Sequence, residues 1–161
     1  MVIDIASPHC EPLFSQFQNT GLPVLAVVNN ADADFTKRYS SSRVKIQTEM
    51  VSVRSVAQPC KIVFGQADHD LAYEFLLMGV PFILLPNGIQ NTLLTYRLAK
   101  KRLASAGPSK SSKLDVTALI ETKRTVDQVW HNASRFSLKY ENHSSLTRLH
   151  ELIKTLCSKA A

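Results

Sequence analysis

Apolar residues form two kinds of pattern along this chain, and the two alternate most clearly at residues 62–97. A short apolar run is followed by a turn and by an apolar helical pattern that stops at Gly79. A second apolar run ends at Pro86, and another turn and helix follow. Apolar runs without alternating polar residues are typical of parallel strands that are covered on both faces. Ligands bind beyond the carboxyl ends of such strands, so the loops at residues 65–70 and 86–91 are the first candidate site.

The N-terminal third of the chain repeats this order of strand and helix. We predict strands at residues 2–6, 24–28 and 43–47, and helices at residues 12–19 and 52–57. In the third of these strands polar and apolar residues alternate, which predicts one wet face and a place near an edge of the sheet. The predicted fold class is therefore α/β, a doubly wound Rossmann-like parallel sheet.

The C-terminal third changes to helices only. Residues 105–113 read as a low-complexity linker, because small, polar and basic residues replace the apolar pattern there. Residues 125–128 have the form of a capping box, and apolar residues recur at helical spacing after it. We predict one domain over residues 1–161, with its core at residues 1–104 and C-terminal helices at residues 114–158.

The composition is that of an ordinary globular domain. Of the 161 residues 45% are hydrophobic, but no run is long enough to cross a bilayer. The first residues also lack the basic segment of a signal peptide. Cys10, Cys60 and Cys157 are widely separated and lack zinc-ligand spacing, which indicates a reducing compartment. We therefore expect a cytoplasmic location.

The formal net charge of +6 raises the question of an anionic partner. Basic residues are dense only at residues 97–102, with Lys110 and Lys113 beyond, and aromatic residues are not interleaved with them. This pattern favours a solvated helix face over a nucleic-acid surface, so we expect no nucleic-acid partner. Peripheral contact with an anionic membrane, or attraction of a phosphorylated substrate, is the alternative.

The central unit carries a more specific signal. A Gly-Val-Pro triplet begins at Gly79, an apolar strand at residues 82–85 runs to Pro86, and Gln90 stands near the start of the next helix. In this order the unit resembles the C-terminal, donor-binding half of glycosyltransferases with the two-domain GT-B fold, of the UDP-glycosyltransferase and MurG types. The resemblance is close over residues 62–103 and looser over the rest of the chain.

The resemblance implies a site for a nucleotide-diphosphate sugar at the carboxyl ends of the strands. Glu74 falls on the family's ribose-binding glutamate, with a plain surface helix residue as an equal interpretation, and Met50 and Val51 lie where the family packs the base. The turn after the strand offers backbone N–H groups and a helix dipole to the diphosphate. The implied nucleotide-sugar-binding residues are Ser7, His9, Met50, Val51, Gln66, Ala67, Asp68, His69, Asp70, Glu74, Gln90 and Asn91.

The predicted phosphate turn departs from the family pattern. Gln66, Ala67 and Asp68 stand where the family has His-Gly-Gly, and the side chains of Ala67 and Asp68 limit the close approach that glycine allows. Carboxylates at Asp68 and Asp70 would also repel a diphosphate. With His69 between them they spell Asp-X-Asp, a metal-binding motif of another glycosyltransferase fold, but helix capping is the simpler interpretation for at least one of them. We expect no resident metal and no cofactor.

These observations predict the donor-binding domain of a glycosyltransferase that transfers a hexosyl group to an acceptor. The sequence shows no arrangement of catalytic residues. The resemblance implies that the acceptor pocket and the catalytic base lie in an acceptor-binding N-terminal domain or a partner subunit, so we expect an isolated chain to be inactive. The alternative is a non-enzymatic interaction module that keeps the fold and has a degenerate donor site. A sugar-nucleotide epimerase is a third interpretation, which would need catalytic acids in a second half of the protein.

Overall fold

The computed structural model describes residues 1–57, 60–66, 69–109, 114–121, 123–141 and 153–155. Within them six strands form one parallel sheet in the order β3-β2-β1-β4-β5-β6. The strands are β1 (Val2–Asp4), β2 (Val24–Asn29), β3 (Val44–Gln47), β4 (Val63–Gly65), β5 (Phe82–Leu84) and β6 (Ala104–Ala106). The predicted doubly wound α/β fold is confirmed, and β3 lies at an edge as its alternating pattern predicted.

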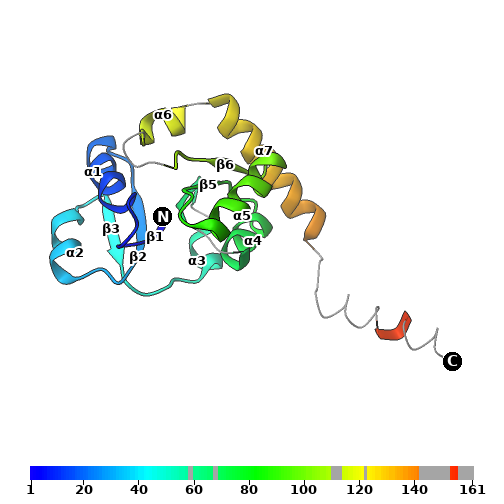
Figure 1. The fold of residues 1–161 in the computed structure, drawn as a ribbon, viewed down its shortest axis with the longest axis horizontal. Helices are drawn as coiled ribbons and strands as arrows, with labels where there is room; N and C mark the ends of the chain where they lie inside the picture. Colours follow the sequence, from blue (N-terminus) through cyan, green and yellow to red (C-terminus); the bar gives the residue numbers. More distant parts are fainter. Residues whose placement is uncertain (58–59, 67–68, 110–113, 122, 142–152, 156–161) are drawn as a thin grey trace.

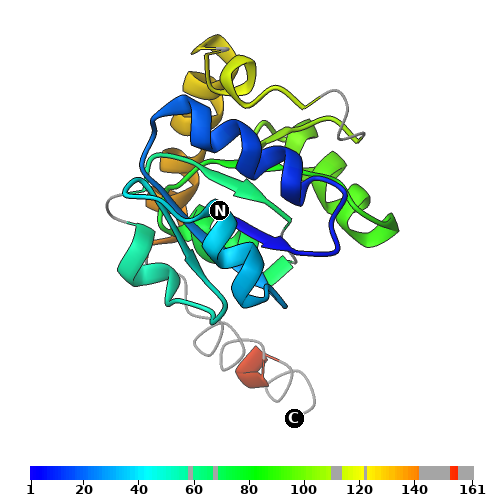
Figure 2. The same cartoon turned by 90° about the vertical axis from the view of Figure 1, so that its left-hand side faces the viewer.

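Helices cover both faces of this sheet (Figures 1 and 2). They are α1 (Cys10–Thr20), α2 (Ala33–Tyr39), α3 (Val53–Ala57), α4 (His69–Leu77), α5 (Ile89–Lys100), α6 (Val116–Glu121) and α7 (Lys123–Tyr140). The long helix α7 packs against α4 and against the edge strand β6. None of the helices in the described part of the chain is long and apolar enough to cross a bilayer.

Two separate apolar cores lie on the two faces of the sheet. One contains side chains from α1, α2 and α6, such as Phe14, and the other contains side chains from α3, α4 and α5, such as Leu94. Neighbouring residues of β5 enter different cores, because Ile83 joins the first core whereas Phe82 and Leu84 join the second. Since both faces of the strand are buried, both must be apolar, which explains the unbroken apolar runs in the sequence.

Some element boundaries near the N-terminus differ from the prediction. β1 ends at Asp4 rather than at residue 6, α1 begins at Cys10, and the sequence pattern did not predict α2. Asp32 is the N-cap of α2 and accepts a hydrogen bond from the Phe35 N–H at 2.6 Å. α2 is too short to show a clear apolar periodicity, but a capping carboxylate can still stabilise its first turn.

The edge strand β6 is a larger correction. It covers Ala104–Ala106, so the predicted linker at residues 105–113 begins inside the sheet. β6 pairs with β5 along its length, and the Gly107 N–H donates to the Leu84 carbonyl at 2.8 Å. The sequence pattern missed this strand because its Ala and Ser side chains are small and give no apolar signal. The strand is defined by its backbone pairing at the edge of the sheet.

The prediction for the start of the last described long helix is wrong. α7 begins at Lys123, so residues 125–128 lie within the helix and not at its start. Of the helices predicted beyond residue 141, the structure describes residues 153–155, which are helical. The remainder of that prediction lies outside the described residues.

The tightest backbone approach at a glycine lies between β1 and β4. Gly65, the last residue of β4, pairs with Val2 and has a φ of 137°. A Cβ at Gly65 would lie 1.8 Å from the carbonyl oxygen of Val2. The same oxygen accepts a hydrogen bond from the Gln66 N–H at 3.0 Å. Glycine is therefore required for β4 to approach β1 and leave the sheet at this point.

Gly65→Ala should lower the free energy of unfolding by about 3–5 kcal/mol, because the added methyl group meets backbone atoms at a strained φ. Gly21→Ala is the matched control, since its φ is 66° but no atom lies within 4 Å of the added Cβ. The control should lose only about 1–2 kcal/mol. Urea unfolding followed by circular dichroism measures both variants, and equal losses would contradict the role of the β1–β4 contact.

Candidate functional site

The candidate site lies at the carboxyl edge of the sheet, between β1 and β4. From β1 the sheet continues through β2 to one edge, and from β4 it continues through β5 to the other. The loops that follow β1 and β4 therefore diverge at the point where the strand order reverses, which is where open α/β sheets bind ligands. The loop after β1 carries Ser7 and His9, and the loop after β4 begins with Gln66.

Ser7 joins these two loops. Its side chain is buried, and its Oγ accepts a hydrogen bond from Gln66 Nε2 at 3.1 Å and a second one from the His9 backbone N–H at 3.3 Å. Because a hydroxyl has two acceptor lone pairs, the remaining hydrogen-bonding capacity of Ser7 is its O–H donor. An anionic ligand requires such a donor.

His9 is the N-cap residue of α1 and is completely buried. Neither of its ring nitrogens has a hydrogen-bond partner among the described residues. Burial lowers the pKa of His9, and the nearby backbone of Pro86 offsets part of this effect. The imidazole is therefore held neutral at pH 7, where the loops after β1 and β5 meet.

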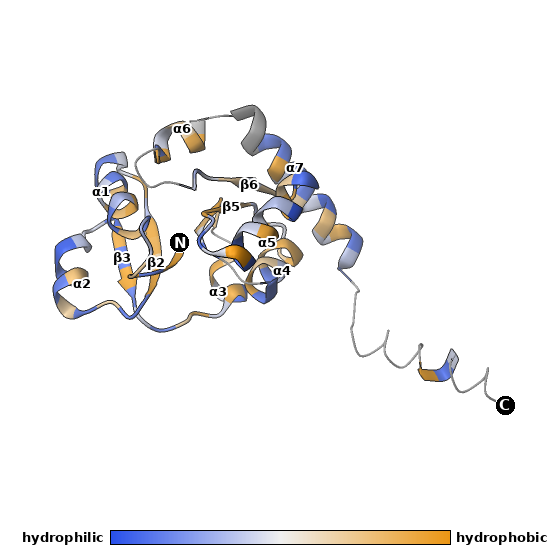
Figure 3. Cartoon of the chain, viewed as in Figure 1, coloured by the Kyte–Doolittle hydropathy of each residue, from blue (hydrophilic) through white to orange (hydrophobic). Residues whose placement is uncertain are grey.

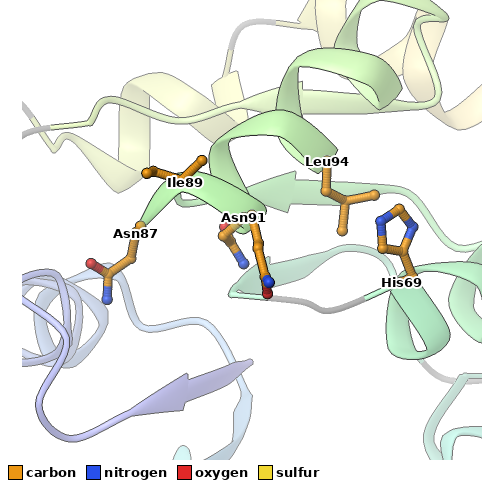
Figure 4. A pocket seen from close by; sticks show the side chains of 7 residues that line it. His69, Asn87, Ile89, Asn91 and Leu94 are labelled. Atoms are coloured by element: carbon orange, nitrogen blue, oxygen red, sulfur yellow. The ribbon is translucent and has the colours of Figure 1, made fainter.

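An open cavity of about 590 Å³ extends the candidate site along α4 and α5. Its lining consists of His69, Asn87, Gly88, Ile89, Gln90, Asn91 and Leu94. Figure 4 shows His69 beside Leu94 at one side of this cavity and Asn87 at the other. His69 is the first residue of α4, and Gly88 is the N-cap of α5 and supplies no side-chain cap. The first residue of α4 and the first turn of α5 therefore line the cavity, and each of these helix N-termini carries unpaired backbone N–H groups and the positive end of a dipole.

Six predicted site residues are brought together in two groups. The group at the cavity consists of His69, Gln90 and Asn91, and the group between β1 and β4 consists of Ser7, His9 and Gln66. Gln66 of one group and His69 of the other stand three positions apart in the sequence.

The other described site residues lie apart from these groups. Glu74 is exposed on α4 and is not among the residues that line the cavity. Asp70 is exposed in the first turn of the same helix. Met50, which is 60% exposed, and Val51 follow the edge strand β3, which is separated from β1 by β2.

Of the predicted phosphate turn at residues 66–68, only Gln66 lies within the described part of the chain. Ala67 and Asp68 lie outside the described residues, so the interpretation of Asp68 as a helix cap or as part of a metal site stays a prediction. Within the described part of the chain, no group of three or more His, Cys, Asp or Glu side chains is placed to hold a metal ion.

Sequence reasoning named the loop at residues 86–91 but not the individual side chains of Asn87, Ile89 and Leu94 that line the cavity. Asn87 and Gly88 form a typical turn pair, and the φ of 79° at Gly88 fits that signal. Leu94 carried no separate signal, because an apolar residue within a helix reads as part of the core.

Comparisons with known proteins identify the fold. No protein-family model matches the sequence, and no curated protein matches it. Among solved structures, UDP-glucose: anthocyanidin 3-O-glucosyltransferase in complex with UDP is 12% identical with a TM-score of 0.74, covering 98% of this chain and 40% of that one. Glycosyltransferase VinC in complex with dTDP is 15% identical with a TM-score of 0.71, covering 95% of this chain and 40% of that one.

A third similar structure is the glycosyltransferase SnogD from Streptomyces nogalater. It is 14% identical with a TM-score of 0.71, and the match covers 96% of this chain and 43% of that one. At these identities the likeness shows the fold. The chain has the Rossmann-like fold of one half of the GT-B glycosyltransferases, as the sequence resemblance predicted, and spans about two fifths of their length.

Stability should fall as the pH decreases below about 6.5, the pKa of an unperturbed histidine. The pKa of His9 is lowered in the folded chain, so the unfolded chain binds the proton first and acid favours unfolding. His9→Asn should make this decrease shallower in urea unfolding measured across pH. The α-amino group of Met1, whose pKa burial lowers to about 6, titrates in an overlapping range, so the comparison with wild type isolates the imidazole.

His131→Asn is the matched control for this experiment, because it replaces an exposed imidazole on α7. It should keep the pH dependence of the wild type. If His9→Asn and His131→Asn changed that dependence equally, the burial of His9 would not be its cause.

Proposed function

We propose that this chain is the donor-binding domain of a glycosyltransferase, which binds a nucleotide-diphosphate sugar at the carboxyl edge of its sheet. The observation that carries the proposal is that the N-terminal ends of α4 and α5 line one open cavity. The cavity lies at the edge of the sheet where the loops after β1 and β4 diverge. Two structures with the same fold are complexes with UDP and with dTDP, which supports a nucleotide diphosphate as the common part of the ligand.

The diphosphate would lie against the helix N-termini. Backbone N–H groups and positive dipole ends stabilise phosphate groups without a side-chain cation. The Ser7 hydroxyl would donate to a phosphate oxygen, since its lone pairs are engaged by Gln66 and by the His9 backbone. The amides of Gln90 and Asn91, which line the cavity, would hydrogen-bond the sugar hydroxyls.

The nucleoside would extend away from the cavity. Glu74 lies five residues beyond His69 on α4, a rise of about 7.5 Å along the helix. Its exposed carboxylate would accept hydrogen bonds from the ribose hydroxyls, and Met50 and Val51 would contact the base. In this orientation the nucleoside contacts Glu74, Met50 and Val51, which do not line the cavity.

The reaction we propose is direct displacement at the anomeric carbon, with transfer of a hexosyl group to an acceptor. This chain would orient the donor and stabilise the departing diphosphate. The acceptor and the catalytic base would come from an acceptor-binding domain or partner subunit, since the chain spans about two fifths of the glycosyltransferases it resembles in fold. We further propose a cytoplasmic setting, in keeping with the free thiols of Cys10 and Cys60.

A second candidate function is a non-enzymatic interaction module. One observation favours it, because one of the two N–H donors of the Gln66 side chain is engaged by Ser7 within the protein. Such a module would keep the fold and bind no sugar nucleotide.

Isothermal titration of the chain with UDP, dTDP, UDP-glucose and UDP-N-acetylglucosamine, with and without Mg²⁺, separates the two functions. Donor binding predicts saturable heats that Glu74→Ala weakens about tenfold or more, since two hydrogen bonds to a charged group are lost. Asp127→Ala removes an exposed carboxylate on α7 and should leave the affinity unchanged.

Three other outcomes would change the assignment of this site. If no nucleotide binds at millimolar concentration, donor binding by this chain is contradicted and the interaction module is favoured. If nucleotides bind but Glu74→Ala and Asp127→Ala have equal effects, the ribose assignment is wrong. If binding requires Mg²⁺, the Asp-X-Asp interpretation of Asp68 and Asp70 gains support.

A further inference from the structure

The outer face of α5 carries an apolar stripe that the described part of the chain does not cover. Ile89 is 81% exposed, Leu93 is 52% exposed and Tyr96 is 64% exposed. The spacing of four and then three residues places the three side chains on one line along the helix. Figure 3 shows hydrophobic segments along the ribbon of α5 beside hydrophilic ones.

This stripe is not an extension of the core. α5 meets the core with Leu94 and Leu98, which lie on the opposite side of the helix by the same spacing. The helix therefore has two apolar faces, of which one is buried and the other faces solvent. A contiguous exposed apolar surface of this kind marks an interaction site more often than an accident of composition.

The C-terminal end of the same face is cationic. Lys100 continues the line of the stripe one turn after Tyr96, Arg97 lies beside that line, and Lys101 and Arg102 follow the end of the helix, all of them exposed. Among the described residues none of these four cations forms an ion pair within 4 Å. α5 contains no acidic residue at all. The charges are thus available to an external anion.

We propose that α5 docks on an anionic lipid bilayer, with the apolar stripe in the interface and the four cations on the headgroups. From Ile89 to Lys100 the face extends about 16 Å along the helix. A helix that lies in the interface plane buries apolar side chains below the headgroups and attracts anionic lipids with Lys and Arg. Tyrosine prefers this depth, because its ring is apolar and its hydroxyl is polar.

Charge decides between a bilayer and a protein partner. A groove on another protein could cover the three apolar residues, but four clustered cations on one side would need a matching group of carboxylates. An anionic leaflet supplies negative charge over its whole surface and matches any such cluster. Ile89 also lines the cavity, whereas Leu93 and Tyr96 do not, and the inference does not depend on donor binding there.

The test is sedimentation of the chain with vesicles of phosphatidylcholine alone and with vesicles that contain about 30% phosphatidylglycerol. Binding to the anionic vesicles is expected, and it should weaken between about 0.05 and 0.5 M salt because the charges are screened. Lys100→Gln/Lys101→Gln should reduce the partition coefficient by at least about tenfold, at about fivefold per charge. Leu93→Ser/Tyr96→Ser should reduce it by a similar factor.

Matched controls remove the same chemistry elsewhere. Lys37→Gln/Lys45→Gln lowers the net charge equally at the opposite side of the sheet, and Leu22→Ser/Leu138→Ser removes two exposed apolar side chains. Both controls should bind vesicles as the wild type does. Circular dichroism of every variant establishes that the fold is retained.

A fluorescence measurement locates the contact. In a Trp130→Phe background, the tryptophan fluorescence of Tyr96→Trp should be quenched by brominated lipid. Absence of vesicle binding by the wild type overturns the proposal, as does equal loss in the Lys37→Gln/Lys45→Gln control, which would indicate diffuse attraction by net charge. Concentration-dependent self-association that Leu93→Ser/Tyr96→Ser abolishes, without vesicle binding, would assign the stripe to a protein interface instead.

Discussion

The close approach of β4 to β1 is the constraint on which the rest of the site depends. At Gly65 the absence of a Cβ lets the strand come against the carbonyl of Val2, and the following N–H closes a hydrogen bond to that same oxygen. This contact fixes where Gln66 leaves the sheet, and so brings its amide to the Ser7 hydroxyl. A side chain at position 65 would separate the strands and with them the two loops between which the strand order reverses.

Burial on both faces determines where polar chemistry can occur. The two cores occupy the faces of the sheet, so polar side chains and unpaired backbone groups collect at the ends of the strands. At the carboxyl edge this gives a neutral, buried His9, a Ser7 hydroxyl that can donate, and the N-terminal ends of α4 and α5 around one cavity. Such an edge can hold an anionic ligand in a fixed orientation.

Local pattern was sufficient for much of the fold. Unbroken apolar runs predicted β4 and β5, and alternation placed β3 at an edge. The stop of the helical pattern at Gly79 is also seen, since its φ is 72° and its N–H bonds the Leu76 carbonyl at 3.0 Å. The two loops named from sequence do supply residues of the candidate site. These features could be predicted because a strand buried on both faces, a helix end and a turn each restrict the residues that form them.

The sequence by itself therefore determined the α/β class, the order of most elements and the edge of the sheet where a ligand would bind. Tertiary structure decided the edge strand β6, whose Ala and Ser residues carry no apolar signal, and the burial of His9. It also decided the contact between Ser7 and Gln66 and the exposed second face of α5. The physical reason is that the periodicity of a sequence depends only on residues that are close together along the chain. Pairing at an edge, burial and solvent exposure depend on segments that meet only after folding.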